Sequence, residues 1–65
     1  MNEPLNNELA PEVMLMVKEA ARDLHYKLIE SGVLGDETPG ENAQTRNYLV
    51  EQFTKVTQTV LKFKS

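Results

Sequence analysis

Hydrophobic residues recur every three or four positions in the first half of the chain, which is the pattern of an amphipathic helix. Pro11 suits the first helical position, because the N–H that proline lacks has no partner there in any helix. Gly32 supplies a left-handed residue just after the last turn, and we expect Val33 to fold back on Leu28 beside it. The pattern predicts a helix over residues 11–31.

The strongest local signal lies at the start of the second half, where Thr38 is followed by Pro39 and, three positions on, by Glu41. Threonine before a helix accepts from the N–H three residues later, and a glutamate at that later position bonds back to the threonine N–H. This capping box predicts a helix over residues 39–62, with a loop over 32–38 before it.

The last part of the second helix has a competing interpretation, because residues 54–64 are rich in threonine and valine, which favour strands. Strand alternation leaves neither face cleanly apolar. A helix instead gathers large apolar residues in a seam with steps of four and three. The period therefore favours a helix, and the seam consists of Leu49, Phe53, Val56, Val60 and Phe63.

Two helices of similar length joined by a short loop form an antiparallel hairpin, so the predicted fold class is all-α. We expect the seam of the second helix to pack against the regular stripe of the first. The predicted core therefore consists of the seam together with Val13, Val17, Ala21, Leu24 and Leu28.

A second set of residues in the first helix lies across the helix axis from this stripe. Tyrosine and arginine are enriched at the energetic centres of protein interfaces, and both occur in this set. We interpret the set as a self-association surface; a docking face for a different protein and scattered surface residues without a role are the alternatives. The predicted interface residues are Leu15, Met16, Arg22, Tyr26 and Ile29, extended by Tyr48 of the second helix.

The chain has 65 residues and no cysteine, so disulfides cannot support its small core. Oligomerisation is the remaining way to add buried area, and two hairpins make a four-helix bundle. We therefore expect a homodimer. The polar residues 1–9 are predicted to form a flexible tail, which leaves 10–65 as the helical hairpin.

Ten acidic and seven basic residues give a net charge of −3, which argues against non-specific binding to nucleic acid. No apolar run approaches the length of a membrane span, and the first residues lack the basic and apolar segments of a signal peptide. The expected location is cytoplasmic, without a membrane partner.

Candidate chemistry is sparse, since His25 is the single histidine and no glycine-rich phosphate loop is present. We interpret His25 as a boundary residue whose ring packs while one nitrogen stays hydrated; a pH-sensitive contact across the dimer and a metal or catalytic role are the alternatives. No catalytic, metal or cofactor site is predicted. The expected function is that of a non-catalytic protein-binding module acting as an adaptor, inhibitor or accessory subunit, and the alternative is a nucleic-acid-binding regulator built as a symmetric four-helix bundle.

Overall fold

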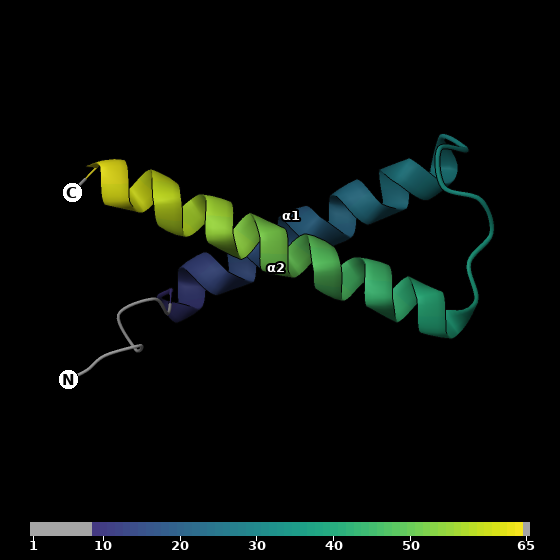
Figure 1. Ribbon diagram of the computed structural model, residues 1–65, viewed down its shortest axis with the longest axis horizontal. Helices are drawn as coiled ribbons and strands as arrows, with labels where there is room; N and C mark the ends of the chain where they lie inside the picture. Colours follow the sequence, from purple (N-terminus) through teal and green to yellow (C-terminus); the bar gives the residue numbers. More distant parts are fainter. Residues whose placement is uncertain (1–8, 65) are drawn as a thin grey trace.

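The computed structural model describes residues 9–64, and within them the chain folds as two helices that pack against each other as a hairpin (Figure 1). Helix α1 spans Pro11–Glu30 and helix α2 spans Pro39–Lys64. The prediction of an all-α hairpin is confirmed. The flexible tail predicted for residues 1–9 lies outside the described residues except for Leu9.

The two helices cross near their middles in the shape of an X, with the loop at one end and the beginning of α1 and the end of α2 at the other (Figure 1). The molecule is accordingly elongated, with extents of 43 × 22 × 16 Å. The crossing makes the helices contact closely over a short length. Beyond the crossing, the beginning of α1 and the end of α2 diverge.

Helix α1 ends at Glu30, and Gly32, two residues later, lies in the left-handed region at a φ of 82°. The N–H of Gly32 donates to the carbonyl of Ile29 at 3.1 Å, as expected after a C-terminal glycine. The expectation that Val33 folds back on Leu28 is wrong, because Val33 is 72% exposed. Its N–H bonds to the Ser31 hydroxyl, and the Leu28 carbonyl accepts instead from the N–H of Leu34.

Helix α2 begins with the predicted capping box. The Thr38 N–H donates to Glu41 Oε1 at 2.9 Å, and the Glu41 N–H donates to Thr38 Oγ1 at 3.2 Å. The helix continues to Lys64, two residues beyond the predicted end, and α1 ends one residue before its predicted end.

The competing strand for residues 54–64 is excluded, since this segment is helical to Lys64. Two of its threonines fit a helix because their hydroxyls bond to backbone carbonyls of the turn before them. Thr54 Oγ1 donates to the Val50 carbonyl at 2.7 Å, and Thr59 Oγ1 donates to the Lys55 carbonyl at 3.0 Å.

The buried interior of the hairpin is small. Of the hydrophobic side chains in residues 9–64, Val17 and Ala21 are buried, and both lie on the face of α1 that meets α2. No residue of α2 is fully buried. The fold therefore leaves much of its apolar surface in contact with water.

Candidate functional site

An apolar cleft opens between the first half of α1 and the second half of α2, where the helices diverge. Its volume is about 310 Å³. Thr57 contributes its one polar side chain, and the lining residues are Val13, Met16, Val17, Ala20, Phe53, Val56 and Thr57. The cleft follows from the crossing, because two helices that separate at an angle cannot fill the space between their ends.

The predicted seam of α2 continues along this end of the molecule. Leu49 and Phe53, near the crossing, are half-buried. Val56 and Phe63 are 61% and 82% exposed, and Val60 is also exposed. One face of α2 thus runs from partial burial at the crossing to an uncovered apolar surface near its C-terminus.

The core residues predicted for α1 lie at the contact between the two helices or at its edge. Val17 and Ala21 are buried, and Val13, Leu24 and Leu28 are half-buried. A single chain covers the first part of the predicted core and leaves the last part of α2 uncovered. The expectation that the whole seam packs against α1 is therefore wrong within one chain for Val56, Val60 and Phe63. Their place in the core of a two-chain bundle stays a prediction.

A polar network occupies the other half of the hairpin, between the crossing and the loop. His25 is fully buried, although it is polar. Its Nε2 lies 2.9 Å from Glu37 Oε1, and its Nδ1 accepts from Arg46 Nε at 3.1 Å. Glu37 Oε2 accepts in turn from Thr45 Oγ1 at 2.7 Å. Three segments, α1, the loop and α2, are joined through this one imidazole ring.

The geometry fixes where the ring proton of His25 lies. Arg46 Nε can only donate, so Nδ1 must be the acceptor. The proton is therefore on Nε2, which donates to Glu37 Oε1. This tautomer satisfies both nitrogens of a buried ring, as a buried polar group requires.

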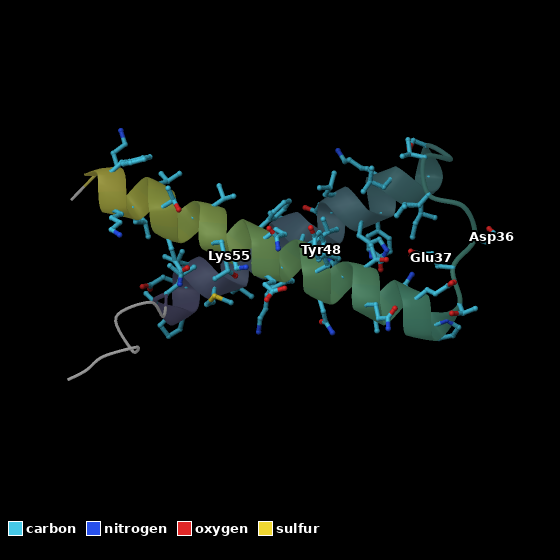
Figure 2. The ribbon with its side chains drawn as sticks, in the orientation of Figure 1. Asp36, Glu37, Tyr48 and Lys55 are labelled. Carbon is cyan, nitrogen blue, oxygen red and sulfur yellow. The ribbon has the colours of Figure 1, made fainter. Side chains whose placement is uncertain are left out.

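Glu37 enters the network because the loop turns it inward. Figure 2 shows Glu37 between the two helices and its neighbour Asp36 pointing away from them. The hydrogen bond from His25, together with that from Thr45, lowers the pKa of Glu37 below its ordinary value of 4.5, while desolvation acts in the opposite direction. Both hydrogen bonds favour the ionised carboxylate.

The interpretation of His25 as a boundary residue with one hydrated nitrogen is wrong. Both nitrogens bond to protein groups, and the ring is 0% exposed. A sequence signal for this burial exists, because Val17, Ala21 and His25 are spaced four apart and form the one fully buried line of α1. The role of Glu37 had no such signal, since a loop acid before a helix cap looks like ordinary turn chemistry.

The structure separates the predicted interface residues into three places. Leu15, Tyr26 and Arg22 are exposed on α1, and Ile29 is half-buried beside them. Met16, in contrast, lines the cleft.

Tyr48 is exposed on α2 and does not line the cleft. It borders a shallow depression lined by Gln44, Asn47, Val50 and Glu51, all of which belong to α2. Figure 2 places Tyr48 over the crossing of the helices. The expected extension of the α1 surface by Tyr48 stays a prediction.

Within residues 9–64, no group of three histidine, cysteine, aspartate or glutamate side chains is arranged to hold a metal ion. Neither helix in this range combines the length and the apolar character needed to cross a bilayer. No protein-family model matches the chain, and no curated protein or solved structure is significantly similar to it.

Proposed function

We propose that this chain is a non-catalytic protein-binding module, which acts as an adaptor, inhibitor or accessory subunit and works as a homodimeric four-helix bundle. The observation that carries the proposal is the apolar cleft, together with the uncovered seam of α2 that leads from it. Helices are the natural occupants of such a cleft, because an amphipathic helix places side chains at every third or fourth position into an apolar groove.

The composition of the cleft favours a protein over a small molecule. Sites for small molecules combine an apolar wall with several convergent polar groups that fix the orientation of the ligand. In this cleft Thr57 is the one polar side chain. An apolar wall without such groups suits the side chains of another helix, whose own backbone already satisfies its hydrogen bonds.

The small interior of the hairpin favours a second chain as well. Covering one exposed valine or phenylalanine fully stabilises a fold by roughly 1.5–3 kcal/mol. Val56, Val60 and Phe63 are 61%, 47% and 82% exposed within one chain, so a partner that covers them adds much of that gain. A dimer that covers them adds the burial that a two-helix domain lacks.

A glutamate substitution at Val56 tests the proposal. Val56 is 61% exposed in the single chain, so a charge there costs one hairpin little but disrupts any interface over the cleft. The expected result is a wild-type protein near twice the chain mass of 7.4 kDa and a Val56→Glu variant at the chain mass, measured by sedimentation over a dilution series.

Val33→Glu is the matched control, because Val33 is exposed in the loop and lies outside the cleft. It should sediment as the wild type does. A wild-type protein that sediments at the chain mass and still unfolds cooperatively would contradict the homodimer.

A further inference from the structure

One flank of α1, exposed except at the half-buried Ile29, carries cationic and apolar residues without an acidic residue among them. The stripe has steps of three, four, four and three, which place its members along one side of the helix. We call it the basic stripe, and it consists of Leu15, Lys18, Arg22, Tyr26 and Ile29. The acidic residues of α1 follow their own line with steps of seven, four and seven, and these are Glu12, Glu19, Asp23 and Glu30.

Arg46 reaches this stripe from α2. Its guanidinium carbon lies 5.5 Å from the centre of the Tyr26 ring, within the range of a cation–π contact. Its Nε is held by His25 Nδ1, which sets the direction of the side chain. The buried network thus positions a cation at the surface, over a tyrosine that is 55% exposed.

The charge of Arg46 has no carboxylate partner within residues 9–64, although the side chain is half-buried. A cation that has lost part of its hydration gains most from an acidic partner placed on its open side. Arg22 gains less from an acidic partner, because it is exposed and Asp23 Oδ1 already lies 3.7 Å from its Nε. Arg46, beside the basic stripe, is therefore the cation expected to contribute most to binding an acidic partner.

We propose that the basic stripe and Arg46 bind an acidic amphipathic helix of a partner protein. A carboxylate of that helix pairs with Arg46, and its apolar residues pack on Leu15, Tyr26 and Ile29. The apolar residues in the stripe favour a peptide over a nucleic acid. A phosphate backbone is bound by cations along its length, and Leu15 and Ile29 occupy positions in the stripe where such cations would be needed. The inference rests on the proposed protein-binding function but uses a surface other than the cleft. It assigns this flank of α1 to a different protein, which is the alternative to the self-association surface that the sequence pattern favoured.

The test uses two designed helical peptides that share one leucine stripe and carry either glutamate or lysine at the flanking positions. Binding to the full-length wild-type protein is measured by fluorescence anisotropy. The glutamate peptide should bind at least about tenfold more tightly than the lysine peptide, because complementary charges add affinity and like charges oppose it.

Arg46→Gln should remove most of this preference for the glutamate peptide. Because Arg46 also bonds to His25, a Lys18→Gln, Arg22→Gln double variant provides a surface change that leaves the buried network intact and should lower glutamate-peptide affinity several-fold. Lys55→Gln removes a positive charge of α2 outside the stripe and is the matched control, with unchanged affinity. Figure 2 locates Lys55 on the C-terminal side of the crossing.

Equal binding of the two peptides would overturn the inference, as would a loss in Lys55→Gln as large as in the double variant. Tighter binding of a single-stranded oligonucleotide than of the glutamate peptide would assign the stripe to nucleic acid instead. Val56→Glu separates this inference from the proposed function, because it should abolish the dimer while the glutamate peptide still binds. If the wild type is a monomer but still prefers the glutamate peptide, the homodimer proposal is wrong and the proposed role of the basic stripe is supported.

Discussion

Replacing His25 with leucine tests whether the buried network holds the loop end of the hairpin together. Leucine is apolar and of similar volume, so the substitution removes the hydrogen bonds with little change in packing. Arg46 Nε then loses its acceptor at a half-buried position. Glu37 also loses one of its two side-chain donors, which lowers the stability of the fold further.

The magnitude follows from the bond between His25 and Arg46. A hydrogen bond to a charged group contributes about 1.5–3 kcal/mol when its loss leaves the partner unsatisfied. At roughly 0.05–0.15 kcal/mol per residue, a chain of 65 residues has about 3–10 kcal/mol of stability in all. The variant should therefore lose a large fraction of the free energy of unfolding, with a Tm lower by on the order of 10 °C.

The assay is urea unfolding followed by circular dichroism at one fixed protein concentration, because the proposed self-association would make the measured stability depend on concentration. A His25→Leu, Arg46→Leu double variant completes a mutant cycle and should lose about 1 kcal/mol less than the sum of the single losses. A His25→Leu cost below about 0.5 kcal/mol, or a double variant whose loss equals that sum, would refute the reasoning.

Three further predictions concern the loop and the helix ends. Thr38→Ala removes the side-chain acceptor of the Glu41 N–H and should cost about 1 kcal/mol in urea unfolding; no measurable loss would contradict the cap. Because the pKa of Glu37 is lowered in the folded chain, the stability that it contributes is present above its ordinary pKa of 4.5 and is lost as the pH falls through the lowered value. Thermal unfolding at pH 3 and pH 6 should differ less in Glu37→Gln than in the wild type, and an unchanged difference would exclude this role. Gly32→Ala should lower the free energy of unfolding by roughly 1 kcal/mol, because alanine disfavours a φ of +82°. No atom lies within 4 Å of a Cβ built at Gly32, so a steric clash adds nothing to this cost. Gly35→Ala is the control and should cost less, because Gly35 has equally open surroundings and no positive φ.

The positions of the two helices could be predicted from the sequence because their signals are local. Pro11, the capping box from Thr38 to Glu41 and the glycine at position 32 each act within one turn of the chain. The apolar period likewise decided between helix and strand for residues 54–64. These features need no knowledge of where the other helix lies.

The candidate site was predictable only in part. The sequence marked Met16 and Tyr26 together as one apolar surface, yet Met16 lines the cleft and Tyr26 lies under Arg46. A helical period assigns each residue an angle around its own axis. It does not say where the second helix crosses, and the crossing decides which angles face a cleft, a buried contact or water.

The sequence by itself determined that this protein is a pair of amphipathic helices with defined ends and more apolar surface than one hairpin can cover. The tertiary structure alone decided that His25 is buried, that Glu37 turns inward to meet it, and that Arg46 is directed onto Tyr26. The physical reason is distance along the chain. Arg46 is 21 residues from His25, and contacts of that kind depend on the crossing of two helices, which no local pattern encodes.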